Sequence, residues 1–200
     1  ASSIYINGFL RMYKVTGVII TNFVFEADDS NWDVFYSMAY IQDSMIQIHL
    51  SMPIVANMSY ILQVFSYRSG GSKIKKSSID VSGICNSFVL CESSSSASNE
   101  CWIYDSIVNF NLSVKCLNEY NKGRYFNTKL TGKINTVQGS TGAGTKHVLG
   151  RSFTDSIIDV EIEDVSDSKT FITTDTSYSA NNLYNSDKLT VGSSINGFTS

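Results

Sequence analysis

Two stretches of strict alternation between apolar and polar residues constrain the fold of this chain most strongly. The apolar positions of the first are Val108, Phe110, Leu112, Val114 and Cys116. The corresponding positions of the second are Phe126, Thr128, Leu130, Gly132 and Ile134. Because side chains on a strand point to opposite faces with a period of two, each stretch predicts a half-buried β-strand. The polar connection 118–123 ends in glycine, which indicates that the two strands form a hairpin.

Further segments also have strand character, and one has helical character. Strands are expected within 15–25, 45–52, 59–67, 78–91, 101–104 and 156–163, with 78–91 divided into two short strands. A short helix is expected within 30–41, because Ser30 and Asp33 form a capping box before apolar residues at helical spacing. No internal repeat is evident. Short strands at regular spacing favour an antiparallel sandwich or barrel.

The bulk composition limits the organisation of the chain. The 200 residues fit one domain, and hydrophobic residues at 42% suffice for a core. We expect a packed β-sandwich over residues 1–137, followed by a C-terminal extension over 138–200 that is rich in Ser, Asn and Asp. The apolar stretches are too short for a membrane span, so no membrane partner is expected.

The four cysteines, Cys85, Cys91, Cys101 and Cys116, contain no C-x-x-C pair, so a zinc site is not expected. Reduced thiols are favoured because free cysteines are commonly buried. The even count nevertheless leaves disulfides open. Formal glycosylation sequons begin at Asn57 and Asn111.

Charge is segregated along the sequence. A basic segment spans 115–151 and an acidic one spans 155–187, within a net charge of −3. The basic candidates for an RNA-facing or inter-subunit surface are Lys115, Lys122, Arg124, Lys129 and Lys133. We favour the alternative that the two segments neutralise each other, because the basic one lacks interleaved aromatic residues.

No segment carries a strong catalytic or cofactor signature. The glycine-rich stretch 139–146 lacks the Lys-Ser/Thr ending of a phosphate loop and is interpreted as a linker. Asp159, Glu161 and Glu163 offer oxygen ligands for Ca²⁺, but a solvated strand face is favoured. With only two histidines, His49 and His147, we predict no enzyme, no metal and no cofactor.

The order of the expected elements resembles that of one protein family. The matching segments are Asp28-Asp29-Ser30-Asn31-Trp32 with the helix after it, Met45–Leu50, Ile61–Arg68, and the hairpin 107–137. This order is similar to that of the small coat proteins of picorna-like plant viruses, the comovirus, nepovirus and cheravirus relatives. The resemblance covers residues 15–137 and rests on element order. It implies an eight-stranded antiparallel jelly-roll sandwich with one short helix.

The resemblance therefore predicts a viral capsid protein. Such a subunit would assemble with itself and sister coat proteins into an icosahedral shell around single-stranded RNA, in the virion and, before assembly, in the host cytoplasm. The alternative is a secreted β-sandwich that binds carbohydrate or a cell surface, favoured by the sequons, the cysteines, and Trp32 and Trp102. A hydrolase with a Ser/His/Asp site assembled in three dimensions is a third, weaker hypothesis.

Overall fold

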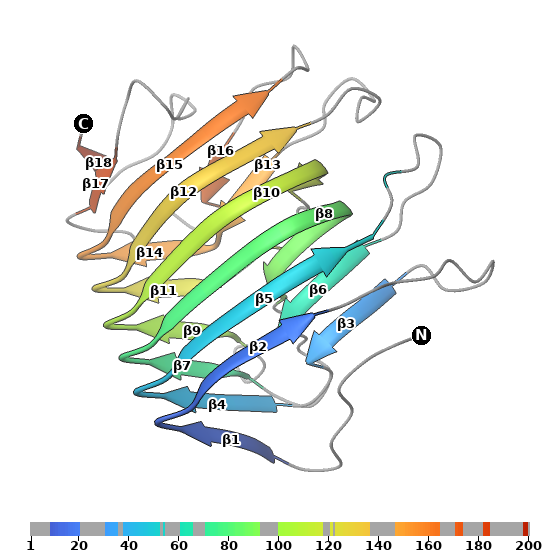
Figure 1. Cartoon of the computed structure of the whole chain (residues 1–200). Coiled ribbons are helices and arrows are strands. Elements are labelled where there is room, and N and C mark those ends of the chain that lie inside the picture. The colour runs from blue at the N-terminus through green and yellow to red at the C-terminus, as the bar shows by residue number, and fades with distance from the viewer. Residues whose placement is uncertain are drawn as a thin grey trace.

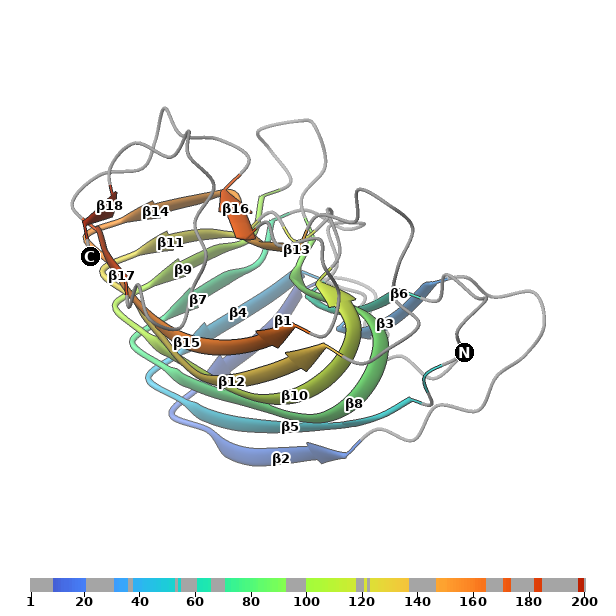
Figure 2. The ribbon, with the colours of Figure 1, turned by 90° about the horizontal axis from the view of Figure 1, so that it is seen from above.

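The chain forms a β-solenoid of parallel strands (Figures 1 and 2). The computed structural model describes residues 9–20, 31–35, 38–52, 54, 61–65, 71–92, 100–117, 121, 123–136, 147–164, 171–173, 182–184 and 198–199. Within these ranges every regular element is a β-strand, and the paired strands are all parallel. The predicted antiparallel jelly roll is therefore wrong, although the all-β character is correct.

Two sheets form the walls of the solenoid. The small sheet contains, in order, β1 (Phe9–Tyr13), β4 (Met38–Gln42), β7 (Lys73–Lys75), β9 (Trp102–Tyr104), β11 (Arg124–Phe126) and β14 (Ser152–Thr154). The large sheet follows the order β18 (Phe198–Thr199), β17 (Asn182–Tyr184), β15 (Ile157–Asp164), β12 (Lys129–Thr136), β10 (Ile107–Leu117), β8 (Ser78–Cys91), β5 (Met45–Ser51) and β2 (Thr16–Ile20). Figure 1 shows the coils stacked from β1 and β2 to β14 and β15, and Figure 2 shows the two walls meeting at one corner.

Four shorter strands lie beside these walls. β3 (Asn31–Phe35) pairs with β6 (Ile61–Phe65), and β6 pairs with the second half of β8. β13 (His147–Gly150) pairs with β16 (Phe171–Thr173). β8 is one continuous strand rather than two, because its first half follows β5 and its second half follows β6.

The predicted hairpin is also corrected. β10 and β12 are neighbours as expected, with Val108 opposite Leu130, but they run parallel. The chain between them passes through β11 in the other wall before it returns. Alternation fixes which face of a strand is buried but not the direction of its neighbour. Both sheets continue past residue 137, where the packed domain was expected to end, because β14 and β15 add a further coil.

The helix predicted within 30–41 is replaced by two strands, β3 and β4. Ala39 and Ile41 are buried, while Tyr40 and Gln42 alternate with them on the outward side. The same apolar residues satisfy a period of two as well as a helical period. Pairing with β1 and β7 favours the strand over the helix, because it gives the backbone of β4 hydrogen-bond partners on both sides.

The core is built of side chains stacked coil upon coil. One row crosses the small sheet through residues paired in register: Ile41, Ile74, Ile103, Tyr125 and Phe153. A facing row crosses the large sheet: Ile48, Val81, Phe110, Gly132 and Val160. Apart from Gly132, which is partly exposed, the side chains of both rows are almost entirely shielded from solvent. Because the strands pair in register, similar side chains of neighbouring coils lie one strand spacing apart along the solenoid axis. They bury apolar surface continuously along that axis.

A repeated turn joins the small sheet to the large one at the corner. Its first residue has a positive φ, near +50°, in six coils: Lys14, Asp43, Lys76, Asp105, Asn127 and Asp155. In the last five of these coils a buried Ser or Thr follows: Ser44, Ser77, Ser106, Thr128 and Ser156. Asn and Asp tolerate the left-handed conformation better than most residues, which accounts for their frequency here. This turn is an internal repeat that the sequence analysis did not find.

The turn hydroxyls form a ladder along the corner. Each donates to the carbonyl two residues earlier, as Ser77 Oγ does to Lys75 O at 2.8 Å. Several also accept an amide from the preceding coil, so that Ser44 N donates to Ser77 Oγ and Ser77 N to Ser106 Oγ, both at 3.1 Å. The ladder satisfies backbone groups where the chain changes sheets.

Candidate functional site

The outward side of the small sheet carries an ordered row of cations and aromatic rings. The residues paired in register across its strands are Arg11, Tyr40, Lys73, Trp102 and Arg124. Cation and ring therefore alternate from strand to strand, at a spacing of about 4.8 Å. We define the aromatic–cation face as Arg11, Tyr13, Tyr40, Lys73, Lys75, Trp102, Tyr104 and Phe126.

Cations lie close to the rings at the N-terminal end of this face. The guanidinium carbon of Arg11 is 5.9 Å from the centroid of the Tyr40 ring, and Lys73 Nζ is 6.0 Å from the same centroid. Lys14 Nζ is 5.1 Å from the centroid of Tyr13, whose side chain is 59% exposed. These distances are within the range of cation–π attraction, so the cations are held near the sheet surface.

Three rings pack together further along the face. The centroids of Tyr104 and Phe126 are 5.1 Å apart with planes inclined by 18°, and those of Trp102 and Phe126 are 5.7 Å apart. All three side chains are half-buried. Burial raises the pKa of the Tyr104 hydroxyl above its ordinary value. The face thus offers apolar ring surface together with hydroxyl and indole donors.

The charge of the small sheet is entirely of one sign. Its six strands contain Arg11, Lys73, Lys75 and Arg124 but no Asp or Glu. Arg124 is held by the buried carboxylate of Glu100, with Nε 2.7 Å from Oε2. The positive charge of the sheet surface is therefore carried by the exposed side chains of Arg11, Lys73 and Lys75.

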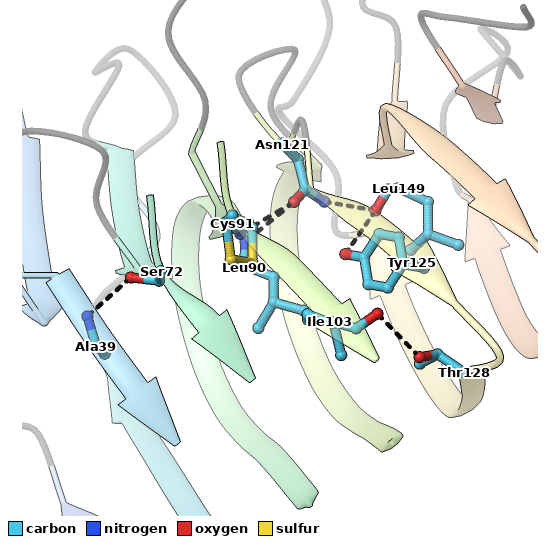
Figure 3. Close-up of a disulfide and its surroundings, with 10 residues drawn as sticks. Ala39, Ser72, Leu90, Cys91, Ile103, Asn121, Tyr125, Thr128 and Leu149 are labelled. Carbon is cyan, nitrogen blue, oxygen red and sulfur yellow. Dashed lines mark hydrogen bonds between the residues drawn. A yellow bond between two sulfur atoms is a disulfide. The ribbon is translucent and has the colours of Figure 1, made fainter. Parts of the chain in front are cut away.

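Covalent and hydrogen-bonded anchors lie behind this face (Figure 3). Cys91 and Cys101 form a disulfide that ends directly before Trp102, so it ties the start of β9 to the end of β8. Asn121 is buried beside it and accepts from the amides of Leu90 and Cys91 at 3.2 and 3.3 Å. The same side chain donates to the carbonyls of Val148 and Leu149. One asparagine thereby joins three successive turns of chain.

The basic cluster expected from the sequence is distributed over two walls. Lys115 lies on β10, and Lys129 and Lys133 lie on β12, all in the large sheet. Arg124 belongs to the small sheet and is paired with Glu100. Lys122 lies outside the described residues. The structure thus brings only part of the cluster onto one sheet.

Acidic residues of β15 contact one of these lysines, Lys133. Lys133 Nζ lies 2.6 Å from Glu163 Oε1 and 3.5 Å from Glu161 Oε1. The hydrogen bond from Lys133 to Glu163 raises the pKa of the lysine. Basic and acidic segments therefore neutralise each other at this position. Among the described residues, no group of three or more His, Cys, Asp or Glu side chains is placed to hold a metal ion.

The remaining sequence candidates fall in scattered places. His49 lies on the exposed outward side of β5, and its Nδ1 is 3.1 Å from Ser82 Oγ. Asn111 is exposed on β10, so its sequon faces outward. The side chains of His147 and Trp32, the Asn57 sequon and the stretch 139–146 lie outside the described residues.

Sequence reasoning missed most of the aromatic–cation face. Of its members, only Trp102 was named as a candidate for binding sugar. The cations and rings are separated by about thirty residues along the chain, so only knowledge of the coil register brings them together. The signal that would locate them is the turn itself, an Asp, Asn or Lys followed by Ser or Thr, because the outward positions precede it at fixed offsets.

Comparison with known proteins adds no family assignment. No protein-family model, curated protein or solved structure matches this chain. In the part of the chain that is described, no helix is long and apolar enough to cross a membrane.

Proposed function

We propose that this protein is a recognition module that binds an extended polysaccharide on the aromatic–cation face. The observation that carries the proposal is the row in which Arg11, Tyr40, Lys73 and Trp102 alternate across four adjacent strands. Ring surfaces pack against the apolar faces of sugar rings, and hydroxyl, indole and amine groups supply hydrogen bonds to sugar hydroxyls. A row of such groups is suited to a polymer rather than to a single sugar.

The rigidity of the surface favours this role. Apart from β1 at the edge of the sheet, the strands of the face are paired on both sides, and the disulfide and Asn121 anchor the chain behind it. A surface that is already ordered loses little conformational entropy when a ligand binds. A flat sheet can therefore bind a glycan through several weak contacts without reorganising.

The disulfide also supports a role outside reducing compartments. Cys91–Cys101 joins residues that border the Ser-rich segment, and disulfides of this kind persist in oxidising surroundings. Surface glycans are found in such surroundings. The coat-protein role inferred from the resemblance stays a prediction, but its basis in element order is lost with the jelly roll and the helix.

Binding to a panel of immobilised polysaccharides tests the proposal. The panel should contain neutral and acidic polymers and be read by affinity electrophoresis or calorimetry. Trp102→Ala should weaken the best ligand at least about tenfold, as for a central aromatic anchor. Tyr13→Ala should weaken it less, and because this side chain is 59% exposed, the substitution leaves the fold intact. Ile107→Ala on the large sheet, 49% exposed, is the matched control. Unchanged binding by Trp102→Ala and Tyr13→Ala would show that the aromatic–cation face does not bind the polysaccharide.

A further inference from the structure

From the same face, and resting on the proposed function, we infer that the polysaccharide is anionic and lies across the strands, parallel to the solenoid axis. Its carboxylates are bound by the cations of the row, Lys73 between Tyr40 and Trp102 and Arg11 on the other side of Tyr40. The ligand class is therefore a polymer that contains uronic acids. Two features carry this inference, the spacing of the row and its charge.

The spacing matches a polymer that repeats at the distance between strands. Tyr40 and Trp102 lie two strands apart, about 9.6 Å, with Lys73 on the strand between them. A pyranose residue in an extended chain occupies about one strand spacing. Rings at Tyr40 and Trp102 would then contact every second sugar, and Lys73 would meet the acidic group of the sugar between them.

The charge of the face matches an acidic rather than a neutral glycan. Lys75 lies two residues after Lys73 on the same outward side, and Arg11 lies on the other side of Tyr40. No carboxylate is present on any of the six strands. A ligand that covers these exposed cations removes water from them, and this desolvation costs free energy unless the ligand supplies an anion. A carboxylated sugar is therefore preferred over a neutral one.

The charge of the rest of the molecule disfavours a nucleic acid as the ligand. The chain has a net charge of −3, and its sequence pI is about 5.3. The outward side of the large sheet mixes the carboxylates of Asp80, Asp159 and Glu161 with the lysines Lys129 and Lys133. Single-stranded nucleic acid is bound by strongly basic grooves. A uronic-acid polymer is favoured over it because its sugar units repeat at about one strand spacing, the interval at which cations and rings alternate on the small sheet.

The experiment compares one polymer backbone with and without its charge. Polygalacturonate and alginate are titrated by calorimetry against the full chain, beside fully methyl-esterified polygalacturonate and a single-stranded oligouridine. We expect the polyuronates to bind about tenfold tighter than the methyl ester, with an affinity that falls as salt rises. Lys73→Gln should weaken polyuronate binding about three- to fivefold and should weaken binding of the ester less, because only the polyuronate presents a carboxylate to this lysine. Lys129→Gln, an exposed lysine of the large sheet, is the matched control and should change neither.

The outcomes separate this inference from the proposed function. Equal binding of the acid and the ester, with loss in Trp102→Ala, overturns the inference and leaves glycan binding in place. Absence of binding to every polysaccharide overturns both. Tighter binding of oligouridine than of either polyuronate also overturns both and identifies the face as a nucleic-acid surface. Equal effects of Lys73→Gln and Lys129→Gln overturn the assignment of Lys73, because only general charge would then matter.

Discussion

Arg124 contacts the carboxylate of Glu100 through two nitrogen atoms. Its Nε lies 2.7 Å from Oε2, and its Nη2 donates a hydrogen bond to Oε1 at 2.8 Å. Arg151, one coil further along, places Nη1 2.7 Å from the same Oε1. The Glu100 side chain is only 2% exposed, so one buried carboxylate joins three coils of the small sheet. A hydrogen bond between a guanidinium and a carboxylate is among the stronger contacts in proteins because both groups are charged.

Replacing the carboxylate should therefore destabilise the solenoid. In Glu100→Gln the two guanidinium groups lose their common anion while they remain largely buried. We expect a loss of about 2–4 kcal/mol in the free energy of unfolding, measured by urea denaturation. Glu163→Gln, which disrupts an exposed pair with Lys133, is the matched control and should leave the midpoint unchanged. Equal midpoints for both variants would contradict a structural role for Glu100.

The hydroxyl ladder at the corner predicts a second loss. Ser77→Ala leaves the amide of Ser44 without its acceptor and removes the bond to Lys75 O. Because these groups are buried, we expect a cost of about 1–3 kcal/mol in the free energy of unfolding. Ser77→Thr should recover most of the stability, because Thr128 fills the equivalent position in a later coil. If Ser77→Thr, which keeps the hydroxyl, were as unstable as Ser77→Ala, the loss of stability would not be due to the missing hydroxyl.

Local patterns in the sequence predict the faces of the strands but not their directions. The inward residues of β5, including Ile46, Ile48 and Leu50, are buried as expected, and so are Val108 and Phe110 of β10. Both an antiparallel hairpin and parallel coils bury such residues in the same way. The direction depends on where the intervening chain runs, and the three-residue strand β11 is too short to produce a recognisable period.

The candidate site was hidden for a related reason. Each member of the aromatic–cation face is an isolated residue in a different segment, with ordinary neighbours along the chain. The face exists only because the coils stack in register, which places Lys73 beside both Tyr40 and Trp102. The number of residues between equivalent positions of successive coils varies, and loops interrupt it. A short window of the sequence therefore does not reveal the register.

A glycine in the large sheet should tolerate no side chain. Gly132 has a φ of +103°, and a Cβ built there would overlap the carbonyl oxygen of Phe110. We expect Gly132→Ala to lower the free energy of unfolding by about 2–3 kcal/mol, combining backbone strain with overpacking. Gly17→Ala is the control, since its nearest atom would be Val15 Cγ1 at 3.8 Å. A thermal midpoint for Gly132→Ala close to that of Gly17→Ala would argue against the backbone conformation.

The four cysteines should behave as one disulfide and two thiols. Cys91 and Cys101 are bonded, whereas Cys85 and Cys116 are free. Burial raises the pKa of both free thiols, so little thiolate is present at pH 8. Iodoacetamide should modify the folded protein slowly at Cys116 and not at Cys85, and should modify both after unfolding in urea. Intact mass before and after reduction measures this, and alkylation at Cys91 or Cys101 without reductant would contradict the pairing.

Alkaline pH should destabilise the protein through Tyr125. This side chain is fully buried, stacks on Phe153 with ring centroids 4.8 Å apart, and donates its hydroxyl to Leu149 O at 3.3 Å. Burial raises the pKa of the Tyr125 hydroxyl above its ordinary value of 10.0. Above pH 10 the unfolded chain loses this proton while the folded chain keeps it. The corresponding stability is complete below pH 10 and is lost as pH rises further.

The variant Tyr125→Phe isolates this contribution. It should be slightly less stable than the parent at pH 7, because the bond to Leu149 O is lost at a cost of about 1 kcal/mol. Between pH 10 and 11 its free energy of unfolding should fall by about 1 kcal/mol less than that of the parent, because the variant lacks the hydroxyl whose proton the unfolded parent loses in this range. Urea denaturation at several pH values measures both slopes. Parallel slopes for the parent and Tyr125→Phe would mean that the Tyr125 hydroxyl ionises as readily in the folded state as in the unfolded chain.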